Sequence, residues 1–157
     1  MATTVDETAL SGVSCLDFTL FKATLVAMRK TDEARVNTIG VGQNAPSKDE
    51  CSALYSALQA MFAARKAGLK TCIGELNTEL DALSAEAKAY PDDAELADDV
   101  NSLKWKLDVL DNEVDFEDIA ERQAMDAFRN KCRSFRIPRA HALRRTKPDP
   151  TTYVPDQ

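Results

Sequence analysis

Two heptad seams that mirror each other about a proline turn constrain this chain more than any other feature. The first seam repeats apolar residues four and three positions apart: Leu69, Ile73, Leu76, Leu80, Leu83 and Ala87. The second seam has the same alternation after Pro91: Leu96, Val100, Leu103, Leu107, Leu110 and Val114. Such repeats line one face of a helix and pack against a second helix. The short connection predicts antiparallel neighbours, in which Ala87 faces Leu96 and Leu69 faces Val114.

The helix that carries the first seam is expected to begin after Ser47. Ser47 and Glu50 have the spacing of a capping box, in which each side chain accepts a hydrogen bond from the other residue's backbone N–H. The helical pattern then continues to Tyr90 and Pro91, a run of roughly 42 residues that would be roughly 63 Å long. A helix of this length is typical of a coiled coil rather than of a compact globule.

Two more helices are expected, one on each side of the hairpin. The first is expected to begin at Ser14, which can cap it with Asp17 three residues on. Its apolar face would be Phe18, Phe21, Leu25 and Met28, and its loop Gly40, Gly42 and Pro46. After the second seam, Asp115 and Asp118 are expected to cap a restarted helix. Its apolar residues would be Ile119, Met125, Phe128, Cys132 and Phe135.

The helical mirror also predicts how the four cysteines pair. Cys51 lies opposite Cys132 across the hairpin, and Cys15 lies opposite Cys72 across the loop near residue 43. Cys51 and Cys72 share one helix roughly 31 Å apart, whereas disulfide-bonded Cα atoms lie within about 7 Å. Cys72 is similarly far from Cys132. We therefore expect the disulfides Cys15–Cys72 and Cys51–Cys132, which favour an oxidising compartment over the alternative of four cytosolic thiols.

Two features near the predicted disulfides leave alternatives open. Gly68 and Gly74 flank Cys72 within a helix, where glycine is unfavourable. They indicate either close approach of the first helix or glycines tolerated on the surface. Trp105 occupies an outward heptad position between Leu103 and Leu107. It is either a partner-binding residue or is covered by the first helix or by a bent helix end.

A basic segment near the C-terminus is the second candidate for partner binding. Eight basic residues and no acidic residue lie between Arg129 and Lys147, although the whole chain has a net charge of −6. This segment indicates a docking arm for an acidic partner or for anionic lipid head groups, and the alternative is a solvated basic end. Its candidate binding residues are Arg133, Arg136, Arg139, Arg144 and Arg145. No nucleic-acid partner is expected, because no binding fold or aromatic platform accompanies the charge.

Several classes of protein are disfavoured by what the sequence lacks. No apolar run approaches the roughly 18 residues of a membrane span. Residues 1–13 contain no Arg or Lys and no apolar core, so they are unlike a matrix presequence or a secretory signal. There is a single histidine, His141, and no phosphate-binding Gly-rich loop. We therefore expect no catalytic residues, no cofactor and no metal site.

The ordered combination of several short motifs resembles the family called Mix twenty-three. The matching segments are Val13 to Cys15 with Phe18, Met28-Arg29, Cys51 with Leu54-Tyr55 and Leu58, Arg65, Cys72-Ile73, Leu103-Lys104-Trp105, and Arg122 with Phe128 and Cys132-Arg133. The likeness covers roughly residues 13–138 and keeps the four cysteines in order. This sequence departs from the family in its tail, which continues about 20 residues beyond the family's usual end.

The resemblance implies a small disulfide-bonded coiled-coil protein of the mitochondrial intermembrane space. Members of this family are imported without a presequence, are trapped by the disulfide relay of that compartment, and support protein import through an inner-membrane translocase. We expect an all-α fold: an elongated antiparallel helical hairpin with an additional N-terminal helix. Residues 1–13 would form an arm, residues 14–136 the stapled domain, and residues 137–157 a basic, Pro-rich tail. The alternative function is an accessory structural subunit of a large inner-membrane complex of the respiratory chain or ATP synthase.

Overall fold

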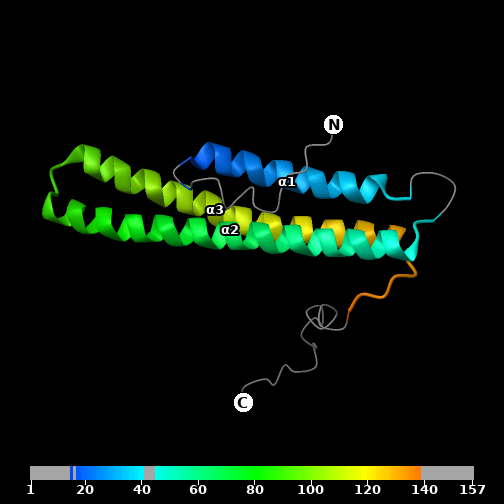
Figure 1. Ribbon diagram of the computed structural model, residues 1–157. Coiled ribbons are helices and arrows are strands. Elements are labelled where there is room, and N and C mark those ends of the chain that lie inside the picture. The colour runs from blue at the N-terminus through cyan, green and yellow to red at the C-terminus, as the bar shows by residue number, and fades with distance from the viewer. Residues whose placement is uncertain (1–14, 16, 41–44, 139–157) are drawn as a thin grey trace, which may run out of the picture.

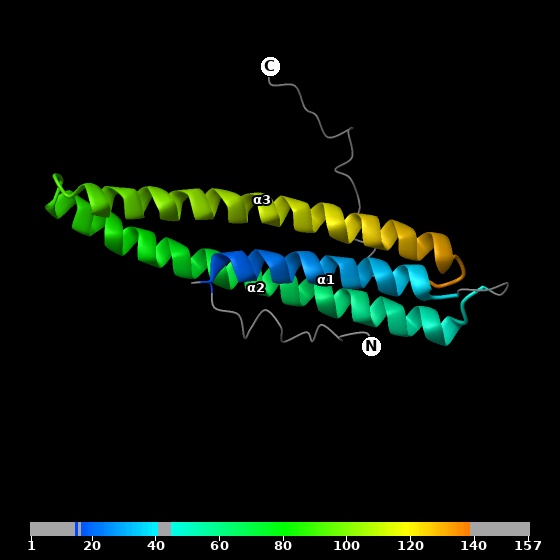
Figure 2. The same cartoon turned by 90° about the horizontal axis from the view of Figure 1, so that it is seen from above.

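The protein is a helical rod in which two long antiparallel helices are joined over half their length by a third. The computed structural model describes Cys15 and residues 17–40 and 45–138. Its helices are α1 (Phe18–Thr38), α2 (Lys48–Ala89) and α3 (Ala94–Lys131). Both views place α1 beside α2 and α3, on the half of the rod farther from the α2–α3 turn (Figures 1 and 2). The predicted all-α hairpin with an added N-terminal helix is confirmed.

We call the end at the α2–α3 turn the tip and the opposite end the base. Only α2 and α3 form the tip, where Leu80 and Leu83 are partly buried. From the middle of the rod to the base, α1 adds a third apolar face. There Leu25, Met28 and Leu58 are fully buried. Burying a side chain of this size stabilises a fold by about 1.5–3 kcal/mol. Within the described residues, no helix combines the length and apolar character needed to cross a membrane.

Short polar residues set where each helix begins. The Ser47 capping box is present: the Glu50 backbone N–H donates to Ser47 Oγ, and the Ser47 N–H donates to the Glu50 carboxylate, each at 3.1 Å. Asp93 caps α3 by accepting from the Leu96 N–H at 3.1 Å. Asp17 caps α1 in the same way through the Leu20 N–H. α1 therefore begins at Phe18 and not at Ser14, which lies outside the described residues.

A glycine allows the chain to turn after α1. Gly40 has a φ of +62°, in the left-handed region that residues with a Cβ rarely adopt. A Cβ built on Gly40 would lie 2.8 Å from Pro46 Cδ, so space as well as dihedral requires glycine here. The loop expected from Gly40 and Pro46 is therefore present. Gly42 lies outside the described residues.

The predicted restart of a helix at Asp115 is wrong, because α3 continues without a break from Ala94 to Lys131. No Gly or Pro interrupts this stretch, so nothing forces the backbone to end there. The seam shifts phase instead. Val114, expected in the second seam, is 39% exposed, and Ile119, expected among the apolar residues of the restarted helix, is 45% exposed, whereas Glu113 and Glu117 are buried. These carboxylates have ionic partners inside the rod: Arg29 of α1 contacts both, and Arg65 of α2 contacts Glu117.

Candidate functional site

Two disulfides staple α2 to its neighbours at different levels of the rod. Cys15 is bonded to Cys72, with the Cα atoms 5.4 Å apart, and Cys51 is bonded to Cys132, with the Cα atoms 5.9 Å apart. This is the pairing that the mirror argument predicts. The first bridge lies at the N-terminal end of α1, and the second lies at the base, where α2 begins and α3 ends.

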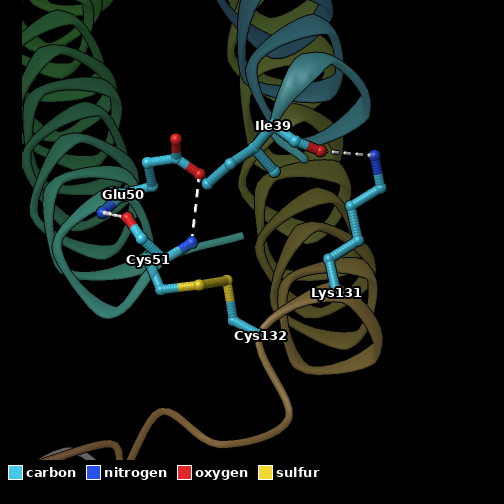
Figure 3. The surroundings of a disulfide bond; sticks show 6 residues. Ile39, Glu50, Cys51, Lys131 and Cys132 are labelled. Carbon is cyan, nitrogen blue, oxygen red and sulfur yellow. Dashed lines mark hydrogen bonds between the residues drawn. A yellow bond between two sulfur atoms is a disulfide. The ribbon is translucent and has the colours of Figure 1, made fainter. Parts of the chain in front are cut away.

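The base is also held together by polar contacts around the second disulfide (Figure 3). Lys131 Nζ donates to the carbonyl oxygens of Asn37 and Ile39 at 2.8 and 3.1 Å. These carbonyls lie at the C-terminal end of α1, where they lack partners within the helix and where a cation is favourable. Lys131 belongs to the predicted basic arm, but its charge is engaged within the fold.

An aromatic cluster packs beside the same disulfide. The ring of Phe135 lies 5.5 Å from the rings of both Tyr55 and Phe128, measured between centroids. Phe135 follows the end of α3, so the cluster holds the outgoing chain against the base. Burial raises the pKa of Tyr55 above its usual value, because the charged phenolate would lose solvation there.

A buried network of five charged residues joins all three helices in the middle of the rod. At its centre Arg65 of α2 is fully buried. Its Nη1 lies 2.7 Å from Asp32 Oδ2 on α1, and its Nε lies 2.7 Å from Glu117 Oε1 on α3. Arg29 of α1 adds contacts of 2.8 Å to Glu113 and 3.1 Å to Glu117. Arg29 Nη2 also donates to the Glu113 backbone carbonyl at 3.2 Å.

The charges of this network are uneven, because two guanidinium groups face three carboxyl groups. The Asp32 carboxyl group contacts Arg65 as an ion pair, with Oδ2 2.7 Å from Nη1. Burial raises the pKa of Asp32 above its usual 3.8, although the nearby Arg65 charge opposes the shift. The folded protein therefore holds a proton on Asp32 more readily than the unfolded chain does.

Sequence reasoning missed this network, although a signal was available. Arg65 lies one heptad after Leu58 and one before Cys72, and Glu117 lies one heptad after Leu110. Both charges therefore occupied seam positions on facing helices. Charged residues at such positions indicate a specific ionic contact within the core. The pattern could have been noticed by continuing both seams past Leu69 and Leu110 toward the base.

Trp105 fits neither of the two alternatives fully. Its ring meets the ring of Phe18 edge to face, with centroids 5.8 Å apart, yet its side chain is 60% exposed. Phe18 is the first residue of α1, so the helix touches the indole but ends before it can cover it. Trp105 is therefore an accessible aromatic surface held in place by a buried neighbour.

The structure does not bring the predicted partner-binding residues together. Arg133 and Arg136 are exposed at the base. At about 1.5 Å per residue, Trp105 lies roughly 40 Å away along α3. Arg139, Arg144 and Arg145 lie outside the described residues. Trp105 and the exposed arginines therefore belong to separate surfaces, and one small partner would not contact both.

As a whole, the site is a helical scaffold held together by two disulfides and a buried ionic network. Its buried carboxyl and guanidinium groups contact each other, so their chemistry is that of structural ion pairs. Comparison with known proteins does not extend this description: no protein-family model matches the sequence, and no solved structure matches the chain.

Proposed function

We propose that the protein is a non-enzymatic factor of the mitochondrial intermembrane space that supports protein import, the role of the family it resembles. The observation that carries the proposal is the pair of disulfides, each joining two different helices. Such bridges form and persist in oxidising compartments and are rare in the cytosol. An oxidative relay that closes them after entry would retain the folded protein in the compartment.

The residues that carry the family resemblance support this proposal by their place in the structure. Arg29 and Arg65 are the two cations of the buried network. The four cysteines form both disulfides. These residues form the ionic contacts and disulfides between helices. The resemblance therefore includes the positions that hold the three helices together.

The compartment is tested by protease access and by the state of the thiols in isolated mitochondria. We expect protease to remove a C-terminal epitope tag once the outer membrane is ruptured, with a matrix protein protected as the control. Without reductant, none of the four cysteines should react with a maleimide. A tag protected until the inner membrane is opened, or four reactive thiols, would contradict the proposed compartment.

A permanent structural subunit of an inner-membrane complex is the second candidate function. The rod shape favours it, because the two-helix tip and the exposed Trp105 offer separate contact points along one elongated molecule. Blue-native electrophoresis of mild detergent extracts distinguishes the two functions. A small free pool supports the import factor, and complete co-migration with a large complex supports the subunit.

A further inference from the structure

A third heptad seam runs along an exposed face of α3. Its positions alternate four and three residues apart; they are Trp105, Val109, Asn112, Phe116 and Ile119. Trp105, Phe116 and Ile119 are 60%, 54% and 45% exposed, and Asn112 at the centre is exposed as well. Apolar side chains at coiled-coil spacing pack against a second helix, and those of this seam stay largely uncovered in the single chain. The seam therefore indicates a contact surface about 21 Å long.

One side of this seam borders the groove between α1 and α3. Glu113 marks that side, because it contacts Arg29 of α1. Ala120 occupies the equivalent position one heptad later and lines the groove, which has a volume of about 450 Å³. Val26 of α1 lines the groove as well. α1 therefore lies next to the seam without covering it.

Unpaired charges of α1 follow this side of the seam, which we call the α1 edge. Of the five charged residues that line the groove, three belong to the buried network; the other two are Lys30 and Glu33. Lys22 lies on the same face of α1, because it precedes Val26 by four residues and Val26 precedes Lys30 by four. Lys22 is partly exposed, Lys30 and Glu33 are exposed, and none of the three forms an ion pair with any described residue. From the middle of the rod toward the base, the α1 edge carries two bases and then an acid.

The other side of the seam, which we call the α3 edge, carries the reverse order of charges. Asp108, Asp115 and Arg122 follow one another there at seven-residue intervals, in the flanking heptad position opposite to that of Glu113 and Ala120. All three are exposed and form no ion pair within the described part of the chain. Toward the base, this edge carries two acids and then a base. The two edges are therefore complementary in sign.

The charges on the two edges also lie at matching levels, because α1 and α3 run in the same direction (Figure 2). Arg29, which precedes Lys30, contacts carboxylates on both sides of Asp115 along α3. Lys30 therefore lies at the level of Asp115. The ring contact at the start of α1 places Lys22 at the level of Asp108 in the same way.

We propose that the protein forms a dimer in which two parallel copies pack their α3 seams together in register. A two-fold axis along the rods brings the α3 edge of each copy against the α1 edge of the other. Lys22 then faces the partner's Asp108, and Lys30 faces the partner's Asp115. At the centre each Asn112 faces the partner's Asn112, and the two amides can donate to and accept from each other. One polar seam position of this kind fixes the register of a coiled coil.

An antiparallel pair of the same seams is disfavoured by charge. It would place the α3 edges of the two copies side by side, so that Asp108 and Asp115 of one copy would repel those of the other. Lys22 and Lys30 of the two copies would be brought together on the opposite side. An anionic membrane surface is a poorer occupant as well, because the aspartates of the α3 edge would repel its head groups. The proposal depends neither on the compartment nor on the function proposed above.

Sedimentation velocity of the full-length, disulfide-bonded protein tests the dimer. We expect monomers at low micromolar and dimers at high micromolar concentration, because so short a seam is at the small end of specific interfaces. Phe116→Ser should weaken dimerisation about tenfold or more, since it removes an aromatic contact from the seam. Leu20→Ser is the matched control: Leu20 is 50% exposed on α1, outside the seam, and the change should leave dimerisation unaltered. A protein that stays monomeric at every concentration, or a Phe116→Ser variant with intact circular dichroism that dimerises normally, would overturn the proposal.

Charge exchange between the copies tests which edges meet. Lys22→Glu alone and Asp108→Lys alone should each weaken dimerisation about tenfold, because each places like charges together at both of the contacts that it alters. A mixture of the two variants should dimerise as the unaltered protein does, since each contact then joins opposite charges. Neither residue belongs to the buried network, so the changes leave its ion pairs in place. No gain on mixing would mean that these edges do not meet.

Cysteine cross-linking tests the direction of the two copies. Parallel packing in register places Ile119 beside the partner's Ile119, whereas antiparallel packing centred on Asn112 would separate the two by about 21 Å. Ile119→Cys should therefore form a disulfide-linked dimer on mild oxidation. Asp118→Cys is the matched control and should not, because Asp118 lies off the seam and lines a pocket between α2 and α3. Equal cross-linking of the two variants, or cross-linking of neither, would overturn the arrangement in register.

Discussion

Arg65 is the residue on which the middle of the rod depends most. Its guanidinium is fully buried and contacts carboxylates from two other helices, and it lies 5.4 Å from the centre of the Phe62 ring. Removing a charge from water is costly, and the cost is offset only when its partners are close and well oriented. The planar guanidinium can contact Asp32 and Glu117 at once, which the single ammonium group of a lysine does poorly.

Arg65→Leu should therefore destabilise the protein strongly. The change leaves Asp32 and Glu117 buried without their shared cation, and losing one partner of a buried pair typically costs about 3–5 kcal/mol. The free energy of unfolding should be measured by urea titration with both disulfides intact. Lys66→Ala is the matched control, because Lys66 forms a half-exposed pair with Glu121 and its loss should cost at most about 1 kcal/mol. Equal effects of the two changes would contradict the importance of the network.

The pH dependence of the unfolding free energy should report directly on the ionisation of Asp32. Because burial raises its pKa above 3.8 in the folded state, the folded protein binds the proton more tightly than the unfolded chain does. The contribution of Asp32 to stability is therefore greatest in acid and falls as pH rises from about 3.8 through the folded-state pKa. Asp32→Asn cannot ionise, and in that variant Arg65 keeps Glu117.

The measurement is the difference in unfolding free energy between Asp32→Asn and the unaltered protein from pH 4 to pH 7. Other titrating groups largely cancel in this difference. The variant should gain stability relative to the unaltered protein as pH rises. A difference that stays constant, or that moves the other way, would mean that Arg65 outweighs burial at this carboxyl group.

At the scale of elements, α2 is the central strut, because both disulfides and the centre of the charged network lie on it. Its 42 residues span the whole length of the rod. It does not need glycine at Gly74: a Cβ built there meets nothing within 4 Å. Of the two explanations for the glycines near Cys72, a tolerated surface residue is the correct one for Gly74.

Gly74→Ala should stabilise the protein by about 1 kcal/mol. Alanine loses less backbone entropy than glycine when it becomes helical, and no neighbouring atom opposes the added methyl group. The midpoint of thermal unfolding should rise by a few degrees for a domain of this size. Gly40→Ala is the opposing control, since its positive φ and its contact with Pro46 should make alanine destabilising. Destabilisation by Gly74→Ala would indicate an unrecognised close approach at this position.

At the scale of the whole molecule, the staples divide the rod into a tethered base and a tip that has no covalent tether besides its turn. Reduction should loosen α1 and the end of α3 more than the tip. α1 has few turns and is connected by a loop, so it depends on Cys15–Cys72, whereas residues 76–107 keep their short turn and leucine seam. Each bridge closes a long loop and contributes about 4 kcal/mol in the chain-entropy model.

Hydrogen exchange with and without reductant measures this difference. Backbone amides of α1 and the last turns of α3 should lose protection on reduction, while those of the tip keep most of theirs. A variant with Cys51→Ser and Cys132→Ser should loosen the base and leave the level of Cys72 protected. Equal loss of protection along the whole rod would show that the tip depends on the staples too.

The sequence by itself determined the helical hairpin, its antiparallel order and the pairing of the cysteines. These features depend on periodicity along one chain: a seam repeated at 3.5 residues, a capping box at Ser47 and a short turn at Pro91 leave one arrangement in which the seams meet. The disulfides follow, because residues at matching distances from a turn face each other. The hairpin and the cysteine pairing can therefore be predicted from local patterns, without knowing where the third helix packs.

Only the tertiary structure decided what happens where α1 joins the pair. There the seam turns from Val114 toward Glu113 and Glu117, and α3 continues through the expected break at Asp115. The choice depends on Arg29 and Arg65 and on the energy of burying charges, which is set by distances between side chains that are far apart in sequence. The same packing leaves Phe116 and Ile119 of α3 exposed. A periodic pattern shows which face of a helix is apolar, but only the position of the neighbouring helices shows which part of that face is covered.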